Sequence, residues 1–275
     1  MKRTALILAA HGSLSEPAVN EQIRGYADAI AARNLFDEVA AAFHQGDPSF
    51  STVLDGLTAD VVTVVPVMTS VGYYSDAVLP RELALHRRFS HVAVRQTGPL
   101  GTHASIIDLM ADRVRCLIER FRRTEADGEI LRSKIDDGIS LAIVGHGTSR
   151  HAKSRHATRD LAAWLRRMRI VDEVVTAFLD DDPPVDSLLE RVTHSNVLIA
   201  PFLIGAGPHA VRDVPRRVGL EIPDNAAPPF FGRVGDRFVV CDGPIGSDSR
   251  IVELIVDLAL SGSAGACVKH AEAAR

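Results

Sequence analysis

Short apolar runs alternate with amphipathic segments along most of the chain. The run Ala5–Ala10 is brief and ends before a His-Gly pair, which is typical of a strand buried on both faces of a parallel sheet. The segment after it places Ile23, Tyr26, Ala27 and Ile30 at the spacing of one helix face. Strands that alternate with helices predict parallel sheets joined by right-handed crossovers.

The alternation continues through both halves of the chain. In the first half the predicted strands are Ala5–Ala10, Glu38–Phe43, Val61–Val67 and Val92–Gln96, and further helices are predicted at Ser51–Leu57, Tyr74–Arg88 and His103–Arg122. In the second half the predicted strands are Leu141–Val144, Glu173–Phe178, Val197–Pro201 and Phe238–Cys241, with helices around Leu161–Met168 and at Ser249–Leu260. The two halves therefore predict the same order of elements.

The two halves are also related residue by residue. An offset of 135 positions relates His11 to His146, Phe43 to Phe178, Pro66 to Pro201, Gly72 to Gly207 and Pro80 to Pro215. Beyond these pairs, Gly98-Pro-Leu-Gly101 matches Gly243-Pro-Ile-Gly246 at an offset of 145, so the second half carries ten extra residues, expected within Arg216–Asp236. We expect a first lobe at residues 1–124, a linker at 125–138, a second lobe at 139–262 and a flexible tail at 263–275. Two facing lobes would enclose a cleft for a small ligand.

Composition and charge exclude several classes of protein. The chain has 275 residues, and its 31 Lys and Arg against 35 Asp and Glu give a net charge of −4, the wrong sign for a nucleic-acid-binding surface. No apolar run approaches the roughly 20 residues of a membrane-spanning helix. The three cysteines are few, odd in number and far apart, which indicates reduced thiols in a cytoplasmic protein.

Three polar residues of the second half follow the predicted ends of three neighbouring strands: His146, Asp180 and His209. Because the carboxyl ends of parallel strands lie at one edge of a sheet, the three side chains could converge there. Two imidazoles and a carboxylate could hold a divalent transition ion, and they could also accept protons near neutral pH. Each residue has a structural alternative: a tight turn for His146, a solvated loop for Asp180 and a helix start for His209.

The first half keeps only part of this set. At an offset of 135, His11 matches His146, but Gln45 stands in place of Asp180 and Tyr74 in place of His209. Tyr and Gln are poor ligands for a transition ion, so we expect one active site, in the second half. The remaining histidines are expected at the surface or on helices, although His44 and His103 should lie at the same sheet edge as His11.

Basic residues crowd the loops around the proposed site. They are Arg150, Lys153, Arg155, Arg212, Arg216 and Arg217. They could bind a ligand with several carboxylates, because a guanidinium matches a carboxylate with two parallel hydrogen bonds, or they could simply be solvated. The glycines around Gly207 would let a flat ligand approach the backbone. The proline-rich insertion Ile222–Gly232 could be a lid with exposed aromatic residues or a packed connector.

With these motifs the chain resembles the class II tetrapyrrole chelatases, the sirohydrochlorin cobalto-, ferro- and nickel-chelatases related to protoporphyrin ferrochelatase. The matching motifs are Ala10-His-Gly-Ser13, Gly145-His-Gly-Thr148, the block from Pro201 to Pro215, and the two Gly-Pro-Leu/Ile-Gly motifs. The resemblance covers nearly all of both halves. It implies an α/β fold of two homologous flavodoxin-like lobes, each with a parallel four-stranded sheet flanked by helices, around one cleft.

The resemblance also implies an activity. Members insert Co²⁺, Fe²⁺ or Ni²⁺ into a sirohydrochlorin-type ring without ATP, in cobalamin or siroheme biosynthesis, so the metal is a substrate and no organic cofactor is expected. The family's two histidines map onto His146 and His209, and its acidic residue maps onto Asp180, where Glu is usual. Arg150, Arg212, Gly207, Tyr74 and His11 are then expected to contact the tetrapyrrole.

Two other functional hypotheses remain. A metal or tetrapyrrole carrier would bind one equivalent and deliver it without catalysing insertion. A histidine phosphatase is disfavoured, because Ala10 and Gly145 stand where an arginine would precede each His-Gly pair. We expect a tetrapyrrole as the binding partner, no nucleic acid and no membrane, in a monomer or a homodimer.

Overall fold

The chain folds into two compact units in a computed structural model. It describes residues 2–84, 92–126, 138–148, 152–207, 209–223 and 226–261, and for 123–126, 152–153 and 209–210 it describes the backbone alone. Unit 1 comprises residues 1–103 with 249–275, and unit 2 comprises residues 104–248. Within the described residues, no helix is long and apolar enough to cross a membrane.

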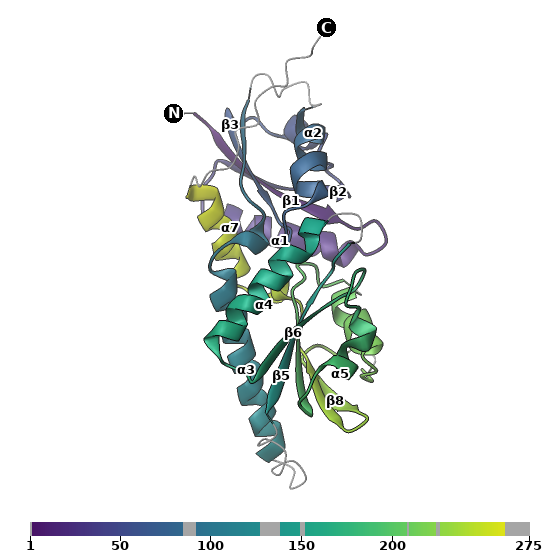
Figure 1. Cartoon of the computed structure of the whole chain (residues 1–275). Coiled ribbons are helices and arrows are strands. Elements are labelled where there is room, and N and C mark those ends of the chain that lie inside the picture. The colour runs from purple at the N-terminus through teal and green to yellow at the C-terminus, as the bar shows by residue number, and fades with distance from the viewer. Residues whose placement is uncertain are drawn as a thin grey trace. The chain divides into compact units, whose positions relative to one another are not determined.

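Unit 1 is built on a parallel sheet in the order β2-β1-β3-β4 (Figure 1). Its strands are β1 (Thr4–Gly12), β2 (Glu38–Gln45), β3 (Val61–Pro66) and β4 (Ala93–Gln96). Its helices are α1 (Pro17–Ala31), α2 (Leu79–Ala84) and α7 (Ile251–Leu260). A π-helical turn at Tyr74–Val78 leads into α2, and 3₁₀ turns lie at Val53–Gly56 and Leu100–Thr102. The strands predicted from apolar runs are therefore confirmed, with ends shifted by one or two residues.

Unit 2 repeats this plan with one extra strand, in the order β6-β5-β7-β9-β8. Its strands are β5 (Ile139–Gly145), β6 (Glu173–Phe178), β7 (Asn196–Pro201), β8 (Phe230–Val234) and β9 (Arg237–Cys241). Its helices are α3 (Ile106–Ala126), α4 (His156–Met168), α5 (Leu188–Arg191) and α6 (Val214–Arg217), with a π-helical turn at His209–Asp213 and 3₁₀ turns at Ala152–Arg155, Val185–Ser187 and Ile245–Ser247.

The prediction of four parallel strands was wrong for the second sheet. The insertion supplies β8, which pairs antiparallel with β9 and forms an edge. Of the two aromatic residues of the insertion, Phe230 is buried against this sheet, whereas Phe231 is exposed. The end of the insertion is thus a packed edge strand, because an alternating aromatic pair places one ring on each face of a strand.

The compact units differ from the two repeats by an exchange of their last helices. The long helix α3 follows β4 in sequence but contacts α4 and β7 of unit 2. Arg113 on α3 donates to Asp242 at 2.6 Å and to the Gly243 carbonyl at 3.0 Å. The helix α7 follows β9 but contacts α1 and β3 of unit 1, where Arg33 of that unit pairs with Glu253 at 2.6 Å.

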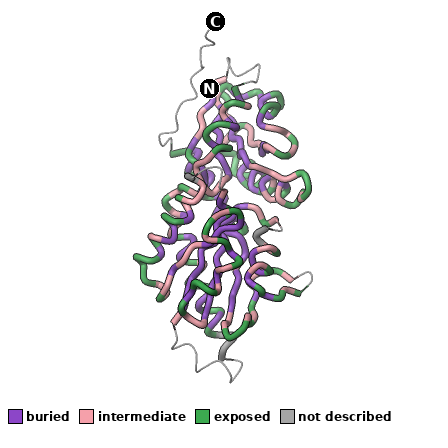
Figure 2. The backbone as a smooth tube through the Cα atoms, turned by 45° about the vertical axis from the view of Figure 1, so that its right-hand side comes forward, coloured by how far each residue is buried: buried purple, intermediate pink, exposed green. Residues whose placement is uncertain are grey.

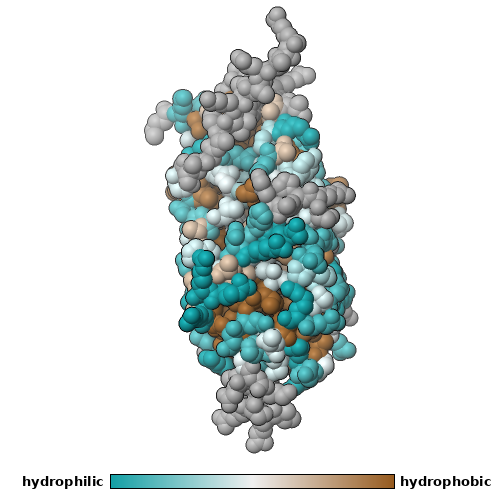
Figure 3. Space-filling model, in the orientation of Figure 1, coloured by the Kyte–Doolittle hydropathy of each residue, from teal (hydrophilic) through white to brown (hydrophobic). Residues whose placement is uncertain are grey.

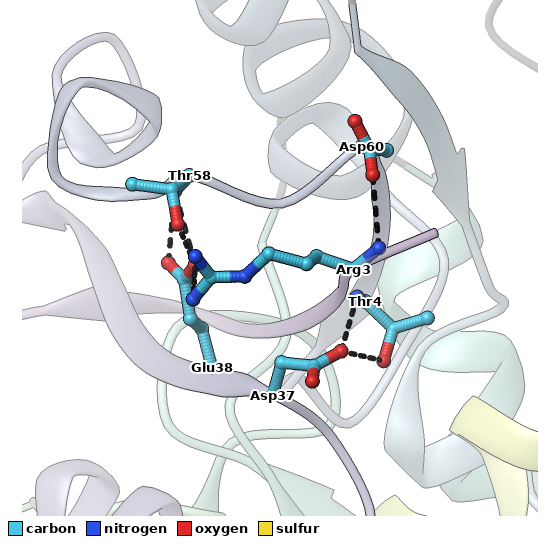
Figure 4. A network of polar contacts seen from close by, with 6 residues as sticks. All are labelled: Arg3, Thr4, Asp37, Glu38, Thr58 and Asp60. Carbon is cyan, nitrogen blue, oxygen red and sulfur yellow. Dashed lines mark hydrogen bonds and ion pairs between the residues drawn. The ribbon is translucent and has the colours of Figure 1, made fainter. Parts of the chain in front are cut away.

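Carboxylates tie the amino-terminal edges of both sheets in the same way. In unit 1, Asp37 accepts the Thr4 N–H at 2.7 Å and Glu38 accepts the Thr58 N–H at 3.0 Å, while Arg3 adds an ion pair to Glu38 (Figure 4). The residues 135 positions later repeat the pattern: Asp172 accepts the Ile139 N–H at 2.7 Å, and Glu173 accepts the Thr193 N–H at 2.9 Å. These shared bonds support a common origin of the two repeats.

Each sheet is the centre of its unit's core. Every residue of β5 is buried, and the strand paths are mostly purple in Figure 2, whereas the outer faces of the helices are exposed. The longest runs without polar residues are therefore the central strands, which are covered on both faces. The candidate residues His11 and His146 lie at the carboxyl ends of two of these buried strands, β1 and β5.

Candidate active site

The Gly145-His-Gly147 turn carries His146 out of the sheet at the end of β5. Gly147 has φ +71°, and a Cβ there would stand 2.6 Å from the Asp181 Cβ and 3.0 Å from the Phe178 Cβ. No larger residue fits this turn without a shift of its neighbours. His146 is consequently presented at the carboxyl edge, with its side chain 52% exposed and accessible to a ligand.

His146 and Asp180 are brought together as predicted from the strand ends. The His146 Nδ1 lies 3.3 Å from the Asp180 Oδ2. The backbone supports this contact, because the Asp180 N–H donates to the His146 carbonyl at 2.9 Å and the Leu179 N–H donates to the Gly145 carbonyl at 3.1 Å. The Asp180 side chain is 63% exposed, so the pair contributes little to stability and keeps its polar atoms accessible.

Two arginines expected near the ligand are engaged in holding this loop. Arg155 pairs with the nearly buried Asp181 carboxylate at 3.2 Å. Arg217 donates to the Leu179 carbonyl at 2.9 Å and bonds Asp186, and its hydrogen bonds lower the pKa of that carboxyl. Both guanidinium groups therefore position the residues on either side of Asp180.

His209 begins the π-helical turn His209–Asp213, but its side chain lies outside the described atoms. Tyr74, 135 positions earlier, begins the matching π-helical turn of unit 1. Such turns are rare and frequent at functional sites, so this position is special in both repeats. The half-buried Gly207 precedes the turn, and its carbonyl accepts the Val211 N–H at 3.2 Å.

The remaining predicted basic residues divide into two groups. Arg150 lies outside the described residues, as does the side chain of Lys153. Arg212 and Arg216 are exposed and line a pocket of about 350 Å³ whose apolar wall includes Ile222 and Phe230. One of these arginines, Arg212, thus lies within the π-helical turn that His209 begins, and Arg216 follows it on α6.

Unit 1 holds a cluster of rings at its own carboxyl edge. The centroids of His11 and Tyr74 are 4.5 Å apart, those of His44 and Tyr74 5.0 Å, and those of His11 and His44 5.4 Å. The His44 Nδ1 lies 3.5 Å from the Glu82 Oε1. Sequence reasoning assigned no role to His44 or Glu82, although the place of His44 at the end of a strand was a usable signal.

Among the described side chains, no group of three His, Cys, Asp or Glu residues is arranged to hold a metal ion. In unit 1 the third partner of the two histidines is a tyrosine ring. In unit 2 the described donors are His146 and Asp180, and these two form an open pair rather than a closed coordination sphere. His103, the other uncertain histidine, bonds Asp257 at 2.8 Å and has a structural partner.

Several known proteins are similar to this chain along most of its length. The chain is 29% identical over 280 residues to the probable sirohydrochlorin cobaltochelatase of Halobacterium salinarum, covering 94% of this chain and 92% of that protein. Its fold resembles the sirohydrochlorin chelatase SirB from Bacillus subtilis subspecies spizizenii in complex with cobalt, with a TM-score of 0.67, 16% identity and 94% of each chain covered.

It also resembles DR2241 of Deinococcus radiodurans, a multi-domain protein with structural similarity to chelatases, with a TM-score of 0.66 and 23% identity. That match covers 96% of this chain and 56% of the longer protein. At these identities the two structures show the fold alone. The resemblance drawn from the His-Gly and Gly-Pro motifs is nonetheless confirmed, since the CbiX family model matches residues 5–117 and 140–260. The chain belongs to the CbiX family.

Proposed function

We propose that this chain is a sirohydrochlorin chelatase, which inserts Co²⁺, Fe²⁺ or Ni²⁺ into sirohydrochlorin without ATP, in cobalamin or siroheme biosynthesis. Its membership of the CbiX family and the likeness to a probable cobaltochelatase along nearly its whole length support this function. The observation that carries it is the contact between His146 and Asp180, 3.3 Å apart at the carboxyl edge of a parallel sheet.

The surroundings of His146 favour one tautomer. Its Nδ1 faces the Asp180 carboxylate at 3.3 Å and the Gly147 carbonyl at 3.1 Å, and both of these groups are acceptors. The proton of a neutral ring therefore belongs on Nδ1, which puts the lone pair on Nε2. An imidazole held in this way can bind a divalent ion or accept a pyrrole proton, and Asp180 stabilises the imidazolium that results.

Insertion releases two protons, because a divalent ion replaces two pyrrole N–H hydrogens. His146 would accept one of them at Nε2. We assign the second, or the delivery of the ion, to His209, which follows the neighbouring strand. A loose pair of donors suits metal transfer better than a closed four-ligand site, which would retain the ion.

We assign the chemistry to the second repeat, residues 139–262. Arg150 and Arg212 would bind the carboxylates of the ring through their forked donors, and Gly207 would let the ring approach the backbone. The first repeat, residues 1–124, would contribute ring contacts from His11 and Tyr74 rather than metal ligands. This division is supported by Gln45 and Tyr74, which stand where the second repeat has Asp180 and His209.

Anaerobic visible spectroscopy tests the proposed activity. Sirohydrochlorin is mixed with Co²⁺, Fe²⁺ or Ni²⁺, one metal at a time, with the protein below stoichiometry. We expect many rings to be converted per chain with at least one metal, at a rate above the metal-only blank. Saturation at one ring per chain without acceleration would contradict catalysis and favour a carrier.

A further inference from the structure

A second groove lies at the opposite edge of the unit 2 sheet from His146. It has a volume of about 540 Å³ and is lined around the first residues of β5 and β6, by α3 and by the end of α4. The candidate active site lies at the carboxyl edge, where open α/β sheets place their ligands. The groove at the amino-terminal edge is therefore separate from it.

The groove combines an apolar floor with a basic rim. Ile118, Ile139 and Val174 form the floor and are only 7%, 7% and 4% exposed. Arg122, Arg166 and Arg169 stand exposed on the rim. On the face of unit 2 that Figure 3 shows, apolar surface is exposed between hydrophilic side chains.

The rim carries more positive than negative side chains, and not all of them have a hydrogen-bond partner among the described residues. The single carboxylate of the lining, Asp172, already accepts the Ile139 N–H at 2.7 Å. Arg166 donates to the Val174 carbonyl at 2.6 Å. Arg122 and Arg169 make no side-chain hydrogen bond or ion pair with any residue that the structure describes. The rim thus keeps an excess of positive charge in a chain whose net charge is −4.

The fold does not require arginine at these positions. Unit 1 builds the same helix end with Ala31 and Asn34, 135 positions before Arg166 and Arg169. Asn34 has φ 53° and Arg169 has φ 52°, so both adopt the left-handed conformation. Asn tolerates this conformation better than Arg, so Arg169 is costlier than the residue that unit 1 uses. A non-glycine residue held in a strained backbone conformation points to a role other than folding.

The extended part of α3 further distinguishes the two units. By the offset of 145, the last residue of α7, Leu260, matches Arg115, whereas α3 continues to Ala126. Ile118 and Arg122 stand on this continuation and supply one wall of the groove. Within the described residues, unit 1 has no counterpart of that wall.

We propose that this groove binds a small organic polyanion, with two or more carboxylates or phosphates on an apolar frame. The guanidinium groups match such oxyanions with forked hydrogen bonds, and the apolar frame would cover Ile118, Ile139 and Val174. The proposal is independent of the chemistry assigned to His146.

Calorimetric titration of the full chain tests this site with three anions. Benzene-1,3,5-tricarboxylate offers three carboxylates on a flat apolar ring, citrate offers three without a ring, and inorganic phosphate offers the charge alone. We expect the aromatic tricarboxylate to bind one per chain and more tightly than citrate, with phosphate weakest. Equal affinity for all three, or no saturable binding, would overturn the proposal.

Variants of the rim separate a site from general surface charge. R169N introduces the residue that unit 1 uses, so this variant should fold at least as well as the wild type. Both R169N and R122Q should weaken binding of the tricarboxylate about tenfold. R167Q is the matched control, because Arg167 lies over the Trp164 ring at 4.9 Å and does not line the groove. An equal loss of affinity in R167Q and R169N would contradict a built site.

Discussion

Single residues decide how His146, the proposed catalytic histidine, is presented. At Gly147 the positive φ and the absence of a side chain both matter, because the Asp181 and Phe178 Cβ atoms leave no room for a methyl group. The turn then directs His146 toward Asp180 rather than into the core. The structure thus links a backbone constraint at one glycine to the contact on which the proposed chemistry depends.

Replacing Gly147 by Ala should destabilise the fold by more than the cost of its conformation. A left-handed alanine costs roughly 1 kcal/mol, and the clash with the next loop adds to it, so we expect a loss of about 2–3 kcal/mol. G235A is the matched control, since Gly235 has φ +61° and nothing within 4 Å of an added Cβ. Urea unfolding of both variants measures the difference. Equal losses would show that the close packing at Gly147 has no energetic weight.

At the scale of elements, the alternation of apolar runs and amphipathic segments predicted most of the fold. Strands such as β5 are buried on both faces, so they appear in the sequence as uninterrupted apolar runs. The strand β8 was missed because its packing depends on a neighbour, β9, rather than on its own five residues. The exchange of α3 and α7 was also invisible, since an apolar helix face does not specify which sheet it covers.

The candidate site, like the fold, could be predicted from the sequence only in part. Convergence of His146 and Asp180 follows from parallel strands in register, which the chain order alone suggests. The ring cluster around His44 was not foreseen, because Glu82 comes from a helix whose rotation no sequence pattern fixes. For Arg155 and Arg217 the sequence leaves two alternatives, a ligand with carboxylates or solvent, because it cannot reveal that Asp181 and Asp186 already pair with them.

The carboxylate that begins β6, Glu173, predicts a measurable response to acid. Burial raises the pKa of Glu173, but hydrogen bonds from Ser140 and Thr193 outweigh burial, and the pKa is lowered from its ordinary value of 4.5. A lowered pKa adds stability that is present above the ordinary value and is lost as the pH falls through the folded-state value.

E173Q should therefore be less stable than the wild type at neutral pH, by roughly 1 kcal/mol for an exchange of charged for neutral hydrogen bonds. The difference should shrink steadily below about pH 4.5, as the wild-type carboxylate becomes protonated. Urea midpoints between neutral pH and about pH 3.5 measure it. E119Q, at an exposed site on α3, is the control and should show no such convergence. A difference independent of pH would contradict the assigned role of the Glu173 charge.

At the scale of the whole molecule, two copies of one plan have diverged at corresponding edges. The amino-terminal edges kept the same carboxylate bonds, whereas the carboxyl edges differ: rings of His11, His44 and Tyr74 in unit 1, and the His146–Asp180 pair in unit 2. Duplication explains this pattern if one copy retains the chemistry and the other is released from it. We infer that metal insertion depends on the second copy.

The rate of Co²⁺ insertion into sirohydrochlorin by H146A and H11A tests this claim most directly. Each variant is assayed anaerobically beside the wild type, with unfolding midpoints to verify that both are folded. Loss of a catalytic acid–base group costs about 10²–10⁴-fold, so H146A should fall at least a hundredfold, while H11A should stay within about tenfold of the wild type. Wild-type rates in H146A, or a collapse of activity in H11A alone, would contradict the account.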